Sequence, residues 1–314
     1  MPALIEAIER VPANGCDPFS GLPRVPVERR SNLTQASFQE FVRGAGRPVI
    51  ITDATLRWPA RKRWSFEFFA ANYGNRRVIA TPNLVTHQDS RRIRLSDFIL
   101  YCHAPSLSPL RTVSTPAPLY VSFPVRQHFP ELIADFSLPE FMENCYRELT
   151  GQLLGWYYDT FAWIYLGPSG TVTPLHVDHF MTHTISAQIS GRKRFLLLSP
   201  DVLDRIPEAA GISRDVFLAT GPDPDAPVAV HEAVVGEGET LMFPAGWAHH
   251  VVALDPSISL SINFVGPSNY LSHLMMISRQ LPAWGRRINS VPFRAANRCE
   301  WSAGSFTALD APAC

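Results

Sequence analysis

The sequence has no long apolar run. No stretch approaches the ~20 consecutive apolar residues that a membrane-spanning helix needs, and the opening segment, MPALIEAIERVPANG, carries two early glutamates where a signal peptide would have its apolar core. We therefore expect neither membrane insertion nor secretion.

Cysteines are few and are not arranged in pairs. Cys16, Cys102, Cys145, Cys299 and Cys314 lie far apart, without a CxxC motif, and their odd number argues against a complete disulfide framework. These features favour a reducing compartment, and we expect a cytoplasmic protein.

Neither sign of charge is in excess, because 28 lysines and arginines balance 28 aspartates and glutamates. The chain thus lacks the overall field that would attract nucleic acid, an anionic membrane or a polycationic partner. Any recognition by charge must be local.

The sequence is rich in proline. Its 28 prolines are spread along the chain, and no internal repeat is visible, which predicts many short elements joined by turns and favours a mainly β protein. With 46% hydrophobic residues the chain can bury a sizeable core. We expect an extended arm over residues 1–33, a folded domain over 34–266 and a helical tail over 267–314.

Hydrophobic periodicity divides the chain into helical and extended segments. Helices are expected over residues 34–46, 65–74, 94–104, 137–149 and 269–282, with Ser65 and Ser96 as N-caps of the second and third. Strands are expected over residues 48–54, 76–83, 119–123, 161–167, 184–190, 192–199, 239–245, 249–254 and 257–265. The last six strands follow one another with turn signals between them, which indicates a barrel or sandwich.

His176 and Asp178 are two residues apart in the segment TPLHVD. In a strand this spacing puts both side chains on one face, where they can share a metal ion. A third ligand from a distant strand would complete a facial triad of two imidazoles and one carboxylate, which leaves three positions open on an octahedral iron(II). Such pairs also arise by chance at polar strand edges, so the pair needs support from elsewhere in the chain.

Two further features point to a site inside a barrel. Downstream, the segment AGWAHHVVAL offers His249 or His250 as the third ligand, and strand alternation does not decide between them. Lys193 shares a strand face with Phe195 and Leu197, and a lysine among inward apolar residues requires a partner unless it reaches the barrel rim.

The last expected strand has one polar and one apolar face. Ser259, Ser261 and Asn263 alternate with apolar residues, and a polar face inside a small barrel is costly unless it meets a ligand or water. Ser261 and Asn263 are therefore candidate site residues. The alternative is a strand whose polar face lies in solvent.

From about Phe38 to Val265 the sequence resembles the Jumonji C branch of the cupin superfamily, in particular its small hydroxylases. The matching segments, in order, are GRPVIITDA, WPA at Trp58, Trp64, YG at Tyr73, TPLHVD, ISGRKRFLLLSP, FPAGWAHHVV and SINF. The resemblance implies a double-stranded β-helix, or jelly-roll, with flanking N-terminal and C-terminal helices.

The resemblance also assigns roles to residues. Its W-x-H motif selects His249 as the third ligand beside His176 and Asp178, which leaves His250 as an outward residue or a neighbour of the ligands. The co-substrate lysine of the family corresponds to Lys193, 17 residues after His176.

Two more co-substrate residues follow from the resemblance, namely Thr173 and Tyr120. One position departs from the pattern of the relatives with a similar spacing, because Ser186 stands where they carry an asparagine. This departure leaves the hydrogen bonding around the co-substrate open.

The implied cofactors are iron(II), 2-oxoglutarate and O₂, and the implied activity is that of a 2-oxoglutarate-dependent dioxygenase. Oxidative decarboxylation of 2-oxoglutarate to succinate and CO₂ would drive hydroxylation of a C–H bond. We expect the substrate to be an amino-acid side chain in a protein or peptide. N-methyl demethylation and hydroxylation of a nucleoside or a small metabolite use the same chemistry and stay open.

Two other classes compete with this interpretation. One is a metal-binding cupin that acts as a sensor or scaffold, although such a protein has no need for the carboxylate clamp that Lys193, Thr173 and Tyr120 would form. The other is a cupin isomerase or dioxygenase with a richer histidine set.

Proximity in sequence suggests a substrate mouth formed by Tyr157, Asp159, Trp163, His179 and His183. The C-terminal helical segment is expected to be either a cap on the barrel or a homodimer surface.

Overall fold

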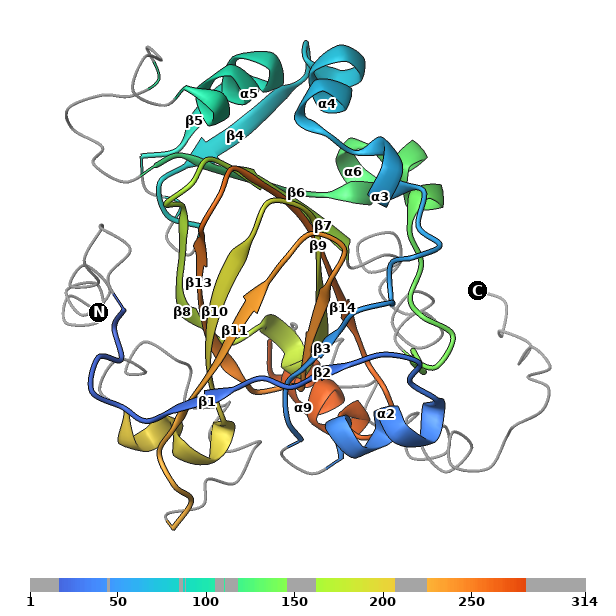
Figure 1. Ribbon diagram of the computed structural model, residues 1–314, viewed down its shortest axis with the longest axis vertical. Helices are drawn as coiled ribbons and strands as arrows, with labels where there is room; N and C mark the ends of the chain where they lie inside the picture. The colour runs from blue at the N-terminus through green and yellow to red at the C-terminus, as the bar shows by residue number, and fades with distance from the viewer. Residues whose placement is uncertain are drawn as a thin grey trace.

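The computed structural model describes residues 17–43, 46–84, 87, 89–104, 110, 118–145, 162–206 and 225–280 of the chain. Within these residues two β-sheets face one another (Figure 1). The smaller sheet has the order β1-β11-β10-β13-β8 and the larger β2-β3-β12-β9-β14-β7-β6-β4-β5. All pairings are antiparallel except those of β1 with β11 and of β2 with β3.

Eight consecutive strands build the centre of the fold. They are β7 (Ala162–Gly167), β8 (Val172–His176), β9 (His183–Ser190), β10 (Lys193–Leu198), β11 (Val230–Val235), β12 (Thr240–Phe243), β13 (Ala248–Ala253) and β14 (Ser257–Phe264). The chain crosses repeatedly between the sheets, since β7, β9, β12 and β14 lie in the larger one and β8, β10, β11 and β13 in the smaller one. This winding is the double-stranded β-helix that the sequence predicted.

The N-terminal half extends the larger sheet and covers its outer face. Its elements are α2 (Gln35–Val42), β3 (Val49–Ile51), α3 (Ala60–Arg63), α4 (Phe66–Tyr73), β4 (Arg77–Thr81), β5 (Arg91–Arg94), α5 (Leu95–His103), β6 (Tyr120–Pro124), α6 (Val125–His128) and the 3₁₀ helix η2 (Pro130–Asp135). Phe38, Phe69 and Phe98 from the helices share one apolar core with Ile185 of β9 and Leu260 of β14. Burial of this core fixes the sheet that carries half of the site.

Both apolar and polar side chains point into the barrel. Phe195, Leu197, Leu241, Phe243 and Val251 belong to one buried cluster between the two sheets. Since successive side chains of a strand alternate between faces, the polar residues on the inner faces of β9 and β14 are brought opposite β8 and β13.

The residues before α2 lie along both sheets. Strand β1 (Arg24–Pro26) pairs with β11 of the smaller sheet, and β2 (Arg29–Arg30) pairs with β3 of the larger one. Asp17 accepts hydrogen bonds from Arg24 (2.6 Å) and Arg194 (2.9 Å), which attaches this segment to β10. The proposed boundary of the arm at residue 33 stays a prediction.

The two predicted N-caps have different outcomes. Ser65 caps α4, since its hydroxyl accepts from the Phe68 N–H at 3.1 Å. The prediction for Ser96 is wrong, because α5 begins at Leu95 and Ser96 lies inside it. The N–H groups of Leu95 and Ser96 donate to the carbonyls of Arg76 and Gly74, so β5 passes directly into the helix without a side-chain cap.

The helix predicted over residues 137–149 is absent from the described part of that segment. Residues 137–145 form a turn, in which the Met142 N–H donates to the Pro139 carbonyl. The Cys145 N–H donates to the Val265 carbonyl at 2.6 Å, and Asn144 accepts from the Val265 N–H. These bonds attach the end of the segment, Asn144 and Cys145, to Val265, the residue that follows β14.

The C-terminal helix α9 (Tyr270–Gln280) forms as predicted and packs under the barrel against the 3₁₀ turn η4 (His179–Met181). Met276 and Met181 share a buried cluster. Helix α9 therefore contacts the turn at one end of the barrel, and both the cap and the homodimer surface proposed for this region stay predictions. None of the described helices combines the length and the apolar character that crossing a membrane requires.

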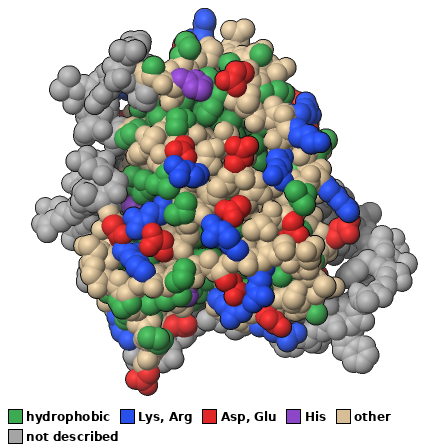
Figure 2. Space-filling model, viewed as in Figure 1, with side chains coloured by type: hydrophobic (Ala, Val, Ile, Leu, Met, Phe, Trp, Pro, Cys, Tyr) green, Lys and Arg blue, Asp and Glu red, His purple; other side chains and the backbone are tan. Residues whose placement is uncertain are grey.

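On the face seen in Figure 2, acidic and basic side chains are interspersed, in keeping with the balanced composition.

Candidate metal and co-substrate site

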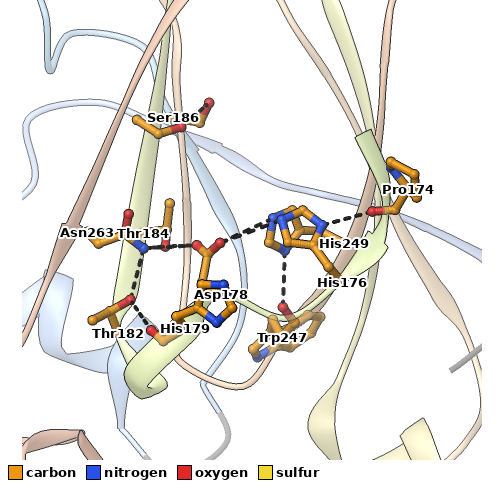
Figure 3. Close-up of polar contacts among 11 residues, drawn as sticks. Pro174, His176, Asp178, His179, Thr182, Thr184, Ser186, Trp247, His249 and Asn263 are labelled. Carbon is orange, nitrogen blue, oxygen red and sulfur yellow. Dashed lines mark hydrogen bonds and ion pairs between the residues drawn. The ribbon is translucent and has the colours of Figure 1, made fainter. Parts of the chain in front are cut away.

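His176, Asp178 and His249 meet at one end of the barrel (Figure 3). His176 is the last residue of β8, Asp178 follows in extended conformation (φ −60°, ψ 144°), and His249 lies opposite His176 on β13. One ligand atom from each of the three lies within 4.8 Å of the others. Asp178 Oδ1 is 3.7 Å from His176 Nε2 and 3.8 Å from His249 Nε2. The arrangement is a two-imidazole, one-carboxylate donor set.

Backbone carbonyls fix both imidazole rings. His176 Nδ1 donates to the Pro174 carbonyl at 2.8 Å and His249 Nδ1 to the Trp247 carbonyl at 3.3 Å. A ring whose Nδ1 carries the proton presents the lone pair of Nε2, which is the atom that faces Asp178 in both cases. The local backbone therefore selects the tautomer that can bind a metal.

The second oxygen of Asp178 is held by two side chains from the larger sheet. Asn263 Nδ2 donates to Oδ2 at 3.0 Å, and Thr184 donates to the same oxygen. Burial raises the pKa of Asp178. The neighbouring His249 and His176 and these two hydrogen bonds lower it by more than burial raises it, so the pKa of Asp178 lies below its usual value. The carboxylate is ionised, with Oδ1 directed at the imidazoles.

The two consecutive histidines occupy opposite faces of β13. His249 points into the barrel, where burial lowers its pKa to about 4 and keeps the ring neutral. His250 lies on the outward face, is 1% exposed, and has no hydrogen-bond partner for either ring nitrogen among the described residues. Only His249 joins the donor set.

A pocket between the two sheets continues from the donor set into the barrel. Its lining residues are Tyr120, Tyr165, Thr173, His176, Asp178, Thr184, Ser186, Lys193, Phe195, Phe243, His249, Val251, Ser259, Ser261 and Asn263. All eight predicted site residues are among them.

Lys193 is the buried cation of this pocket, with 3% of its surface exposed. Its ammonium group donates to Tyr120 Oη and Ser259 Oγ, both at 2.6 Å. No carboxylate of the described residues forms an ion pair with it, and burial lowers its pKa to about 7. An uncompensated buried ammonium beside an open pocket favours an anionic ligand.

Tyr120 and Thr173 complete this end of the pocket. Tyr120 on β6 is buried, and burial raises the pKa of its phenol well above the usual value, while a hydrogen bond with the Thr173 side chain lowers it in part. The phenol is therefore neutral and can donate to an acceptor. Thr173 on β8 brings a hydroxyl from the smaller sheet.

The polar residues of β14 face inward. Ser261 Oγ donates to Ser186 Oγ on β9 at 3.3 Å, while Asn263 also donates to Thr182 and Thr184 at 2.9 Å. The solvent-facing alternative for this strand is wrong, because Asn263 is 7% exposed and Ser259 is 1% exposed. Ser186 lines the pocket in the middle of β9.

Of the residues proposed for a substrate mouth, His179 is exposed beside Asp178 (Figure 3). His183 is not at the pocket, because it lies on the outer face of β9, where its Nε2 contacts Ser268 Oγ at 2.9 Å and its Nδ1 accepts from the Ala245 N–H at 3.0 Å. Trp163 shares the inner face of β7 with Tyr165 but does not line the pocket. Tyr157 and Asp159 lie outside the described residues.

Seven pocket residues were not predicted as site residues: Tyr165, Thr184, Ser186, Phe195, Phe243, Val251 and Ser259. The alternation in the segment TISAQIS would have found Thr184, because it shares a strand face with Ser186 and Gln188. Likewise, Ser259 shares the polar face of β14 with the two residues that were named. Tyr165 carries no such signal, because β7 reads as apolar on both faces.

The fold and the donor set define a jelly-roll protein of the facial-triad type, in which two imidazoles and one carboxylate occupy neighbouring strand ends. A family model described as the Cupin-like domain matches residues 35–270, more than half of the chain. The chain belongs to this family.

Several curated relatives are similar to the chain. A lysine-specific demethylase, JMJ21 of Arabidopsis thaliana, is 26% identical over 263 residues, which cover 78% of this chain and 26% of the relative. The bifunctional arginine demethylase and lysyl-hydroxylase psr-1 of Caenorhabditis elegans is 25% identical over 258 residues, 76% of this chain and 60% of the relative. The 2-oxoglutarate and iron-dependent oxygenase JMJD4 of Gallus gallus is 32% identical over 138 residues, 42% of this chain and 32% of the relative. The matched region thus spans less than two thirds of each relative.

Proposed function

We propose that the chain is an iron(II)- and 2-oxoglutarate-dependent oxygenase that hydroxylates an amino-acid side chain in a protein or peptide. In this proposal His176, Asp178 and His249 hold the metal. Two imidazoles and one carboxylate are donors that non-haem iron(II) takes, and they leave neighbouring positions for other ligands.

The observation that carries the proposal is the position of Lys193. A buried ammonium with only neutral hydroxyl partners is costly on its own. The distal carboxylate of 2-oxoglutarate would supply the missing negative charge, and Tyr120, Thr173 and Ser259 provide hydroxyl groups around it. A scaffold protein would gain stability by losing this lysine, which argues for a bound dianion.

When bound together, iron(II), 2-oxoglutarate and O₂ supply an oxidative decarboxylation that is coupled to hydroxylation of a C–H bond. The chain's own residues bind and orient these groups. Thr184 and Asn263 hold the Asp178 carboxylate toward the metal side, while Phe195, Phe243 and Val251 exclude water from the barrel interior. Ser186 and Ser261, which bond one another, are proposed to contact the co-substrate from β9 and β14.

The proposed substrate class rests on the names of two relatives. The names of psr-1 and of JMJ21 describe enzymes that act on arginine or lysine, and this supports a protein or peptide substrate for the present chain. The same names also favour N-methyl demethylation as a second candidate, since removal of a methyl group begins with hydroxylation of its carbon.

Mass spectrometry of a peptide library separates the two reactions. The protein, loaded anaerobically with iron(II) and 2-oxoglutarate, is exposed to isotopically labelled O₂ in the presence of methylated and unmethylated peptides. A hydroxylase leaves a labelled oxygen atom on the peptide. A demethylase instead removes a methyl group from a methylated peptide, which lowers the mass of the peptide, and releases formaldehyde. Succinate formed without any change in peptides, but with a nucleoside or a metabolite as stimulant, would contradict a peptide substrate.

A further inference from the structure

The turn that follows Asp178 adopts a conformation that its residues seldom take. Phe180 (φ 63°, ψ 19°) and Met181 (φ 52°) are both in the left-handed region, although neither is a glycine. L-residues with side chains occupy this region at an energetic cost, and two in succession persist only where surrounding contacts enforce them.

Two side chains of the region around α9 bind the carbonyls of this turn. His273 Nδ1 lies 2.6 Å from the Phe180 carbonyl, and Asn269 Nδ2 donates to the Met181 carbonyl at 2.8 Å. Asn269 is itself fixed, because its Oδ1 accepts from the Gly266 N–H at 2.8 Å. Both side chains are buried, at 1% and 4% exposure for His273 and Asn269.

The imidazole of His273 is suited to this role. A carbonyl accepts, so the proton must be on Nδ1, and burial lowers the pKa of the ring to about 4, which keeps it neutral. The ring of Phe180 lies edge-on to it, with 6.5 Å between centroids and an interplanar angle of 84°. The contact is thus a directed hydrogen bond with a packed ring beside it.

The turn η4 connects Asp178, the carboxylate of the donor set, to strand β9, which carries the hydrogen-bond donor Thr184. Asp178 is the residue that precedes η4, and Thr184, whose hydroxyl donates to Asp178 Oδ2, lies three residues after Met181. A change of the backbone at Phe180 or Met181 would move Asp178 and Thr184 relative to one another.

We propose that His273 and Asn269 are positioning residues for the metal site: they clamp the left-handed turn at Phe180 and Met181 and so fix the Asp178 carboxylate toward His176 and His249. This inference rests on the proposed metal site. It gives the C-terminal helix a part in metal binding although no residue of that helix lies in the donor set.

The test is the dissociation constant for iron(II), measured in anaerobic solution with 2-oxoglutarate, on the wild-type chain and on four variants. His273→Ala and Asn269→Ala each remove one bond to the turn. His273→Asn keeps an N–H donor near the position of Nδ1, whereas Met276→Ala removes apolar packing of the same helix against Met181 without touching either carbonyl. Thermal unfolding of each apoprotein reports the purely structural effect.

We expect His273→Ala and Asn269→Ala to weaken metal binding by about 10–100-fold, the range typical of residues that support metal ligands. His273→Asn should stay within about threefold of wild type, and Met276→Ala should lower the melting temperature with little change in affinity. Hydrogen exchange of the backbone amides of residues 178–182 should rise in the first two variants only.

Equal affinities in wild type, His273→Ala and Asn269→Ala would overturn the clamp, as would a loss in Met276→Ala as large as that in His273→Ala. A well-folded wild-type chain that binds no iron(II) would instead contradict the proposed function, and the two failures are therefore distinguishable.

Discussion

The ammonium group of Lys193 donates to the phenol oxygen of Tyr120 at 2.6 Å, in a barrel interior where no described carboxylate pairs with it. A second hydroxyl, that of Ser259, lies at the same distance. Neutral hydroxyls solvate a cation only in part, so the apoprotein keeps a destabilising charge that a bound dianion would neutralise. Lys193 should therefore lower the stability of the apoprotein and strengthen the binding of 2-oxoglutarate.

Lys193→Met should raise the stability of the apoprotein and abolish 2-oxoglutarate binding. Methionine fills a similar volume without a charge, and a gain of about 1 kcal/mol would raise the melting temperature by about 2 °C. Calorimetry of the apoprotein and a titration with 2-oxoglutarate measure the two effects. A variant that is less stable than wild type and still binds 2-oxoglutarate normally would contradict this prediction.

The stability difference between these two proteins should also depend on pH. The pKa of Lys193 is lowered from 10.5 to about 7 in the folded chain, so between these values the unfolded chain binds more protons. The stability of the wild type should therefore rise relative to Lys193→Met as the pH increases from about 7 to 10.5. Parallel stability curves for the two proteins over this window would disprove it.

Binding of 2-oxoglutarate should weaken as the pH rises through 7. The dianion requires the protonated form of Lys193, whose pKa in the empty pocket is about 7. The apparent dissociation constant should rise about fivefold from pH 7 to pH 8 and about tenfold over the next unit. Calorimetric titration in two buffers of different protonation enthalpy would reveal the accompanying uptake of a proton. A dissociation constant that is flat between pH 7 and pH 9 would show that the lysine is already charged throughout.

Removal of the donors to Asp178 Oδ2 should weaken metal binding without abolishing it. Asn263→Ala and Thr184→Val each take away one hydrogen bond and should reduce iron(II) affinity by about 10–100-fold. Ser257→Ala is the matched control, since Ser257 is buried on the same strand and its hydroxyl has no partner among the described residues. A loss of affinity in the control comparable to that in Asn263→Ala would mean that the strand, and not the hydrogen bond, is responsible.

The two histidines of β13 should behave differently on substitution. His249→Ala should lose the metal, because the ring is one of the three donors. His250→Leu should keep metal binding and should be neutral or stabilising, since a buried polar ring without partners costs about 1–3 kcal/mol. Equilibrium dialysis with iron(II) and thermal unfolding give the two results. Loss of metal in His250→Leu but not in His249→Ala would reverse the assignment.

The core of the fold was predictable because its strands carry strong local signals. The segments around His183–Ser190 and Ser257–Phe264 alternate polar and apolar residues between turns, and both form long central strands. Strand β11 (Val230–Val235) was missed, because its sequence VHEAVV carries two polar residues in succession. Edge strands β1 and β2 were missed as well, since only pairing with distant β11 and β3 makes them strands.

The errors at helix ends have a common cause. Ser96 has the residue type of an N-cap, but the N–H groups of Leu95 and Ser96 donate to the carbonyls of Arg76 and Gly74, and the helix begins before Ser96, at Leu95. Residues 137–145 have helical periodicity, but they form a turn whose end, at Asn144 and Cys145, is hydrogen-bonded to Val265. In both cases hydrogen bonds to residues distant in sequence outweigh a local preference, namely the N-cap residue type of Ser96 or the helical periodicity of residues 137–145.

For the site, strand alternation brought Lys193 and Asn263 to the barrel interior, but it could not choose between His249 and His250, which are consecutive. The resemblance to the Jumonji C family made that choice. The role of Asn263 as a donor to Asp178 depends on the distance between β14 and the end of β8, which no sequence pattern encodes. The cytoplasmic location inferred from the cysteines stays a prediction.

The central claim is that three donors and one lysine together bind iron(II) and 2-oxoglutarate. Anaerobic titration of the apoprotein with both, followed by visible absorption, tests it most directly, because bidentate binding of a 2-oxo acid to iron(II) produces a metal-to-ligand charge-transfer band. We predict that the band appears in the wild-type chain, disappears in Asp178→Ala, and requires far more 2-oxoglutarate in Lys193→Ala. A well-folded wild-type protein that shows no such band at saturating iron(II) and 2-oxoglutarate would contradict the proposed function.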